Sequence, residues 1–272
     1  MPNPFRRIVL NADDATRAPR GAEAAEALQQ YALAALAAHT DVSGRVDYRA
    51  LRASPAFAKV RAAAATLRRV DLKSMRERRA ALAFWINVYN ALVIHAIVSL
   101  DVRRTVHDVW NFFGRVSYVV GGVMLSLDEI EHGILRDNRQ RPFPPWRAFG
   151  ARDARRALGI TPSDPRFHFA IICGAASCPP VGVYRAATID AQLTLAVRNF
   201  VNTEVTLDAA GRVLCSRLFK WYRADFEAAG GLGPFLIEHL DGGRVRETLA
   251  GGARPCTRYR SYSWALQYPG AD

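Results

Sequence analysis

Apolar residues recur with helical spacing over much of the first hundred positions. Residues 21–38 are rich in Ala, Leu, Glu and Gln, and we expect them to form a helix. Residues 54–69 predict a second helix, because Pro55 stands at a first helical position, where its missing N–H costs nothing. The N-terminal part of the chain is therefore expected to be helical.

A third helix is expected at the centre of the fold. Ser74 followed by Glu77 has the form of a capping box and predicts a helix that runs to about Leu100. Residues 81–95 within it are apolar nearly all round, and a helix of this kind is buried rather than amphipathic.

Short apolar runs bounded by turn residues predict strands later in the chain. Residues 116–120 and 123–127 flank two glycines and are expected to form a hairpin. The apolar run 167–173 lies between Pro165 and Gly174 and predicts a buried strand. Further elements are predicted as a hairpin of 205–207 with 213–215, a helix that begins at a second capping box, Ser126 and Glu129, and helices at 188–202 and 216–227.

These elements predict an α+β fold in a single domain. A central buried helix with flanking helices would pack on a small, mainly antiparallel sheet. We expect residues 1–20 to be a flexible N-terminal arm and residues 21–272 to form the domain. A buried helix against antiparallel strands is also similar to the papain and transglutaminase architecture, which is an analogy of arrangement alone.

The charge of the chain changes this picture little. The net charge is +12, but only three of the basic residues are lysines and the arginines form no long run, so no nucleic-acid partner is expected. No stretch of eighteen apolar residues is present, so we expect no membrane span. The start turns acidic at Asp13 and Asp14, which predicts a cytoplasmic protein, or a periplasmic or secreted one if a signal peptide has been removed.

Cys178 is the strongest candidate for a reactive group. It follows a turn of small residues at the end of the apolar run, where a nucleophile would be accessible. Cys173, Cys215 and Cys256 are expected to be structural, and a Cys173–Cys178 bridge is the alternative to a free thiolate. No spacing of Cys and His matches a zinc site, so no metal and no cofactor is expected.

Two histidines are candidates for the base that would activate a thiol. His132 lies three residues after Glu129 and four before Arg136, so an α-helix would place all three on one face. Glu129 would then orient the imidazole, and Arg136 would bind an anionic group of a substrate. His168 lies in the predicted strand, where alternation turns it away from its two phenylalanine neighbours. A metal site that combines both histidines with the 173 and 178 thiols is a less favoured alternative.

Two amides stand out in the apolar helix. Asn87 and Asn90 lie three residues apart and therefore share a face. A buried amide needs hydrogen-bond partners, and we expect these two to find theirs in residues 167–180 or their neighbours. Either amide could also orient a catalytic histidine or donate to an oxyanion.

Several motifs give the chain a family resemblance. They lie at 84–92, 126–136, 164–170 with 177–179, 219–226 and 262–266. In this order they resemble the domain-of-unknown-function 547 family (DUF547), over about residues 46–267. The chain departs from the family at Ile172, Ser263 and Gln267, where relatives often carry Asn, Asp and Asn. The family has no assigned activity, so the resemblance implies membership rather than function.

The candidate residues favour cysteine-dependent acyl transfer, by a hydrolase or transferase that acts on an amide or ester. Cys178 would be the nucleophile, His132 or His168 the base, and Asn87 or Asn90 the orienting residue. The substrate would be a small molecule or a peptide, and an anionic one would suit the arginine beside the first histidine. The alternative is a non-catalytic protein-interaction or ligand-binding module, in which the same polar residues hold the core together.

Overall fold

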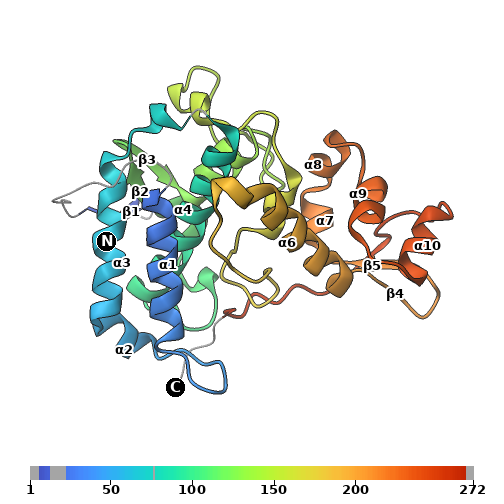
Figure 1. Cartoon of the computed structure of the whole chain (residues 1–272), viewed down its shortest axis with the longest axis horizontal. Coiled ribbons are helices and arrows are strands. Elements are labelled where there is room, and N and C mark those ends of the chain that lie inside the picture. The colour runs from blue at the N-terminus through green and yellow to red at the C-terminus, as the bar shows by residue number, and fades with distance from the viewer. Residues whose placement is uncertain (1–5, 13–22, 76, 268–272) are drawn as a thin grey trace.

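The computed structural model describes residues 6–12, 23–75 and 77–267. Over these residues the protein combines helices with two three-stranded sheets, which confirms the predicted α+β class. A larger body surrounds α4 (Arg78–Ser99), and a smaller lobe made by the C-terminal part of the chain lies beside it (Figure 1). The helix α6 (Ile189–Glu204), which confirms the helix predicted at 188–202, runs between the two.

The predicted central helix is confirmed as α4. Its residues 82–98 are buried without interruption. The helices α1 (Glu23–Ala37) and α3 (Pro55–Thr66) pack against each other, and α1 also packs against α4. Among the described helices, α4 alone is long and apolar enough to cross a bilayer, but 94% of its most apolar stretch is buried inside the protein, as in a core helix.

The start of α4 differs from the sequence prediction. The carboxylate of Glu77 accepts the N–H groups of Arg79 and Ala80 at 2.9 and 2.7 Å, whereas the hydroxyl of Ser74 donates to a carbonyl in its own 3-10 turn. The helix therefore begins at Arg78, and the predicted capping box at Ser74 is wrong.

The first sheet lies on the larger body. The predicted hairpin is confirmed as β2 (Val116–Val120) and β3 (Val123–Ser126). The strand β1 (Ile8–Val9) pairs with β2 in parallel. The side-chain amide of the buried Asn11 donates to the carbonyl of Val119 and accepts the N–H of the same residue. Residues 8–11 thus belong to the fold and correct that part of the predicted flexible arm, whereas residues 1–5 and 13–20 of it lie outside the described residues.

The second sheet lies in the smaller lobe. The hairpin of β4 (Thr206–Leu207) and β5 (Val213–Cys215) is confirmed, and β6 (Arg258–Tyr259) pairs with β5 in parallel. Each sheet therefore has one antiparallel and one parallel pairing, where a single, mainly antiparallel sheet was predicted. The predicted helix 216–227 is divided at Tyr222.

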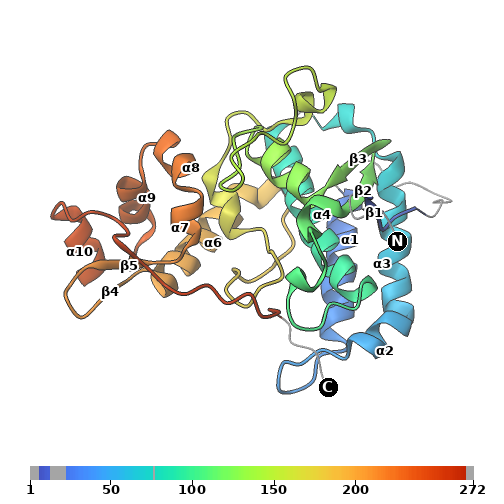
Figure 2. The same cartoon turned by 180° about the vertical axis from the view of Figure 1, so that it is seen from behind.

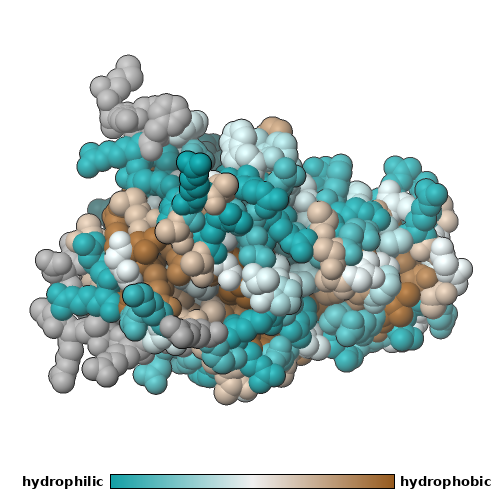
Figure 3. Space-filling model, turned by 90° about the horizontal axis from the view of Figure 1, so that it is seen from above, coloured by the Kyte–Doolittle hydropathy of each residue, from teal (hydrophilic) through white to brown (hydrophobic). Residues whose placement is uncertain are grey.

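The remaining elements are short. The smaller lobe contains α7 (Leu218–Trp221), α8 (Arg223–Ala228), α9 (Leu232–His239) and α10 (Arg244–Ala250). The larger body contains α2 (Tyr48–Ala53), α5 (Phe112–Arg115) and a π-helix at Glu129–Leu135. The 3-10 turns lie at Leu67–Arg69, Leu72–Ser74, Val106–Asp108, Ala154–Leu158, Pro165–Phe169 and Ala186–Thr188. Seen from above, the surface is mostly hydrophilic, with apolar side chains gathered toward the two ends of the molecule (Figure 3).

A disulfide ties the smaller lobe together. Cys215 and Cys256 are bonded across 41 residues, and both are buried in the apolar core of this lobe. Replacing both by serine is expected to lower the free energy of unfolding by about 2–4 kcal/mol, because the unfolded chain regains the freedom that the bridge removes. Urea denaturation would measure the loss. A double variant as stable as the unmutated protein would contradict the assignment of this bridge to stability.

Candidate active site

A small pocket opens where the larger body meets the smaller lobe and the C-terminal segment. Its volume is about 40 Å³. It is lined by Tyr89, Glu131, His168, Ile171, Ile172, Cys173, Cys178, Pro179, Leu218, Tyr222 and Tyr262. Two thiols, an imidazole, a carboxylate and three phenols thus meet within apolar walls, which is the composition expected of a site for polar chemistry.

The two thiols form a close pair. The sulfurs of Cys173 and Cys178 lie 2.7 Å apart, both are free, and both are partly buried. The backbone N–H of Cys173 donates to the sulfur of Cys178 at 3.0 Å, and the hydroxyl of Tyr262 lies 3.1 Å from Cys173 and 3.5 Å from Cys178. Donors therefore converge on Cys178 from several directions.

These contacts make the two thiols unequal. Burial alone would raise the pKa of Cys178, but hydrogen bonds from the Cys173 thiol, the Tyr262 hydroxyl and the Cys173 N–H lower it to about 7. The hydrogen bond with Cys178, followed by burial, raises the pKa of Cys173 well above its ordinary value. The contacts around Cys178 thus favour its thiolate form, whereas those around Cys173 favour its protonated form.

The C-terminal segment brings Tyr262 to the thiols. After β6 the chain returns from the smaller lobe to the larger body (Figure 2). There the N–H of Ala176 donates to the carbonyl of Ala265 at 2.7 Å, and the N–H of Gln267 donates to the carbonyl of Gly174 at 2.8 Å. Backbone pairing with the turn before Cys178 thus fixes the position of Tyr262.

His168 belongs to a buried charge network behind the pocket. Its Nε2 lies 2.8 Å from a carboxylate oxygen of Asp225, and its ring stacks on Tyr222 at 3.9 Å between centroids. Burial lowers the pKa of His168, and the ring is therefore neutral. A neutral ring that donates from Nε2 to a carboxylate carries its lone pair on Nδ1, and no hydrogen bond among the described residues occupies that atom.

The predicted strand that was to carry His168 is wrong. Residues Pro165–Phe169 form a 3-10 turn, because Asp164 accepts the N–H of Arg166 and Pro165 has the φ that such a turn requires. In consequence the histidine does not alternate with its neighbours as in a strand; it turns toward α8 and Asp225.

Arg136 is occupied by protein groups. Its guanidinium bonds both carboxylate oxygens of Asp225 at 2.7 and 3.0 Å, the carbonyl of Gln140 at 2.8 Å, and Nδ1 of His132 at 3.2 Å. Burial would raise the pKa of Asp225, but the hydrogen bonds from His168 and Arg136 hold it well below its ordinary value. The sequence predicted that Arg136 would bind an anionic substrate. Instead the side chain is 2% exposed and neutralises Asp225.

The π-helix changes which carboxylate faces the site. The N–H of Arg136 donates to the carbonyl of Glu131, five residues back, so the side chains do not follow the α-helical spacing used for the sequence prediction. Glu131 lies 3.7 Å from the imidazole of His132 and accepts the hydroxyls of Tyr222 and Tyr89 at 2.5 and 3.0 Å. It is the carboxylate of the pocket.

Glu129 does not orient the imidazole of His132, contrary to what the sequence predicted. It completes the second capping box, which is confirmed: it accepts the N–H of Ser126 at 2.9 Å, and its own N–H donates to that serine. Its carboxylate also pairs with Arg7 and Arg155 at 2.8 and 2.9 Å. These contacts do not include His132, which also does not line the pocket.

Asn87 and Asn90 are both fully buried, as predicted, and each clamps a backbone segment. Asn90 donates to the carbonyl of Ala170 at 2.8 Å and accepts the N–H of Ile172 at 2.9 Å. Asn87 makes the same pair of bonds with Tyr184, at 2.7 and 3.0 Å. The amides therefore hold in place the segments on either side of Cys178, and neither has a hydrogen bond to a thiol or a histidine among the described residues.

Replacing Asn90 by leucine is expected to lower the free energy of unfolding by about 1–3 kcal/mol, because a buried carbonyl and a buried N–H lose their partners. Urea denaturation at neutral pH measures the effect. Asn199→Leu, at an exposed position of α6, is the matched control and should change stability by about 0.5 kcal/mol or less. Equal effects of the two substitutions would refute the clamp.

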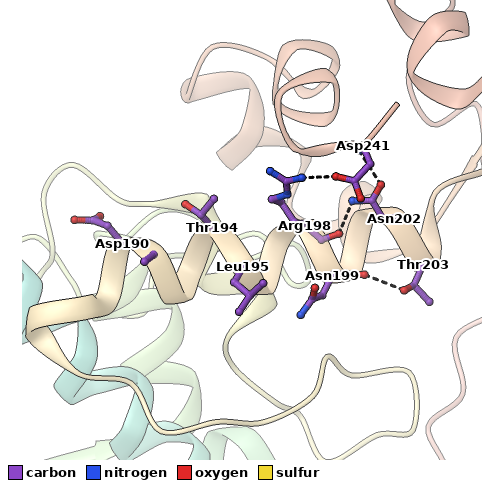
Figure 4. Close-up of a pocket in the computed structure, with 9 residues that line it drawn as sticks. Asp190, Thr194, Leu195, Arg198, Asn199, Asn202, Thr203 and Asp241 are labelled. Atoms are coloured by element: carbon purple, nitrogen blue, oxygen red, sulfur yellow. Dashed lines mark hydrogen bonds and ion pairs between the residues drawn. The ribbon is translucent and has the colours of Figure 1, made fainter. Parts of the chain in front are cut away.

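A broad groove of the described surface lies elsewhere. It runs along the exposed face of α6, with a volume of about 950 Å³ (Figure 4). Its polar groups bond one another: Arg198 pairs with Asp241, and Asn202 accepts the N–H of Asp241 at 2.9 Å. The residues that line it include no thiol and no imidazole, so the cysteine chemistry expected from the sequence has no place there.

The pocket also bears on the metal alternative. Among the described residues, no three His, Cys, Asp or Glu side chains come together as metal ligands would. The proposed combination of His132, His168 and the two thiols is not such a group.

Sequence reasoning missed Asp225, Glu131 and Tyr262 as site residues. Their signal was present, because Asp225 and Tyr262 lie in two of the motifs that carry the family resemblance, and Glu131 lies in a third. Each has a polar side chain among aromatic or apolar neighbours.

Fold and site together define an α+β protein with a buried dithiol pocket. Residues 72–201 match the model of the family described as "Protein of unknown function, DUF547". This match confirms the resemblance to the family over these residues. No significant match was found among curated proteins or among solved structures, so the papain and transglutaminase analogy gains no support.

Proposed function

We propose that the protein is a cysteine-dependent acyl-transfer enzyme, a hydrolase or transferase of amides or esters. The observation that carries the proposal is that Cys178 lines one pocket together with His168, whose free Nδ1 would be the base. Asp225 holds the imidazole by its other nitrogen, as the third member of a catalytic triad does. Asn87 and Asn90, which the sequence suggested as orienting residues, bond backbone groups instead.

The chemistry would run in two steps. Nδ1 of His168 takes the proton of the Cys178 thiol, and the sulfur attacks the carbonyl carbon of the substrate. A C–S bond forms, the C–N or C–O bond of the substrate breaks, and the leaving amine or alkoxide takes that proton from the imidazole. Water or a second nucleophile, deprotonated by the same imidazole, then attacks the thioester and releases Cys178. Tyr262 is a donor that can follow the negative charge from sulfur to the oxyanion.

The charges around the pocket limit which substrate groups can bind beside Cys178. Burial would raise the pKa of Glu131, but its interaction with the imidazole of His132 and the hydrogen bond from Tyr222 lower it, so the pocket contains a carboxylate. Arg136 forms a salt bridge with Asp225 and is not available to bind an anionic substrate. These facts favour a substrate with a neutral or cationic group beside the thiol over the anionic substrate expected from the sequence.

The Cys215–Cys256 disulfide favours an oxidising compartment for the protein over the cytoplasm.

An activated acyl ester tests the proposal. Incubated with the reduced protein, it should form a thioester that mass spectrometry locates at Cys178, and the thioester should decay with time. His168→Gln should slow both formation and decay, whereas His132→Gln should affect them much less. A thioester that forms no faster than on the unfolded chain would leave a non-catalytic module as the better account.

A further inference from the structure

We propose that Cys173 and Cys178 form a reversible oxidation site, at which a hydroperoxide oxidises Cys178 and Cys173 then closes a disulfide on it. The sulfurs lie 2.7 Å apart, and a disulfide needs about 2.05 Å, so a small movement of the connecting turn is enough to join them. This pair stands in addition to the structural bridge of the smaller lobe.

The environments of the two thiols assign their parts. Cys178 accepts the N–H of Cys173 and contacts Tyr262, and these contacts stabilise its thiolate, which is the form that attacks a peroxide. Cys173 remains a protonated thiol because its pKa is raised. Its sulfur is held beside the one that reacts, which is the position of a resolving cysteine.

The turn between them favours closure. Gly174 has a φ of +81°, which places the chain in a conformation that residues with a side chain rarely adopt. A Cβ at this position would also lie 2.9 Å from Ile97 and 3.1 Å from Val106. The turn is thus built to bring the ends of a six-residue segment together.

The oxidation takes place in two steps. The thiolate of Cys178 attacks one oxygen of the hydroperoxide, the S–O bond forms, the O–O bond breaks, and an alcohol or water leaves after taking a proton. Cys173 then attacks the sulfenic sulfur, the S–S bond forms, the S–O bond breaks, and water leaves. The two thiols lose two electrons and the peroxide gains them. An external dithiol reverses the change by two exchange steps.

Oxidation would also stop acyl transfer, a consequence that rests on the proposed function. The disulfide removes the nucleophile, and reduction returns it. The oxidation itself does not depend on any acyl chemistry, so the two proposals can fail separately.

Mass spectrometry of the full chain tests the inference. The reduced protein is treated with hydrogen peroxide, its remaining thiols are alkylated, and it is digested with trypsin. The peptide 167–185 contains both cysteines. We expect it to resist alkylation and to be lighter by two hydrogen atoms, and dithiothreitol should reverse both changes. Cys173→Ser should instead accumulate sulfenic acid at Cys178, detected with a dimedone-type reagent, and Cys178→Ser should show neither product.

Two results would overturn the site. One is a peptide 167–185 that keeps two alkylatable thiols under peroxide. The other is irreversible oxidation of Cys178 in the unmutated protein as readily as in Cys173→Ser. Acyl labelling of the reduced protein is measured in parallel: labelling without disulfide formation would reject the oxidation site alone, and disulfide formation without labelling would reject the acyl-transfer proposal alone.

Discussion

Replacing Asp225 by alanine is expected to lower the free energy of unfolding by about 3–5 kcal/mol. The substitution leaves the guanidinium of Arg136 buried without its carboxylate, and it removes the hydrogen-bond partner of His168. The side chains of Arg136 and Asp225 are each 2% exposed, so water cannot take the place of the lost oxygens. Urea denaturation at neutral pH measures the loss.

The control is a carboxylate that also pairs with an arginine but lies on the surface. Asp241 pairs with Arg198, and their side chains are 60% and 54% exposed. Asp241→Ala should therefore cost about 1 kcal/mol or less. If the two alanine variants are destabilised equally, the network behind the pocket does not have the role assigned to it.

Replacing Cys178 by serine is expected to abolish thioester formation and to reduce turnover by a factor on the order of 10³ or more. A serine hydroxyl has nearly the shape of the thiol, but it is not ionised at neutral pH, and the donors around it cannot make it so. The partly buried position should tolerate the change, with a loss of stability of about 1 kcal/mol or less. Labelling by an acyl ester, with turnover of that ester, measures the first effect, and urea denaturation measures the second.

The variant Cys173→Ser distinguishes the role of Cys178 from that of the neighbouring thiol. This variant removes the thiol that bonds Cys178 but keeps the backbone N–H that donates to it. It should still form a thioester, more slowly than the unmutated protein at pH 7. Thioester on the Cys178→Ser variant at any of its remaining thiols would contradict the assignment of the nucleophile.

Local signals made much of the fold predictable. Helices α1, α3 and α4 follow from apolar spacing and from Pro55, and the hairpin of β2 and β3 follows from two glycines between apolar runs. The segment 167–173 could not be predicted in the same way, because its backbone partners are not another strand. They include the amide of Asn90, which is 80 residues or more away in sequence. The Asp164–Pro165 start of a turn was the local signal that the apolar run concealed.

The polar residues of the candidate site stood out in the sequence, but their hydrogen-bond partners could not be predicted from it. Cys178, His168 and the two asparagines stood out as polar groups inside apolar motifs. Their partners depend on the return of the C-terminal segment and on the position of α8: Tyr262 is 89 residues from Cys173, and Asp225 is 57 from His168. Helical spacing also pointed to Glu129 in place of Glu131, because a π-turn cannot be inferred from an α-helical period.

The rate at which iodoacetamide alkylates Cys178, measured as a function of pH, tests the central claim most directly. The thiolate is the reactive form, so the rate should rise with pH and reach half its maximum near pH 7 in the folded protein. The unfolded chain should show an ordinary thiol, with a midpoint near about 8.5. Tyr262→Phe, which removes one donor, should shift the folded midpoint upward. A folded midpoint at or above that of the unfolded chain, unaffected by Tyr262→Phe, would contradict the claim that the pocket holds Cys178 as a nucleophile.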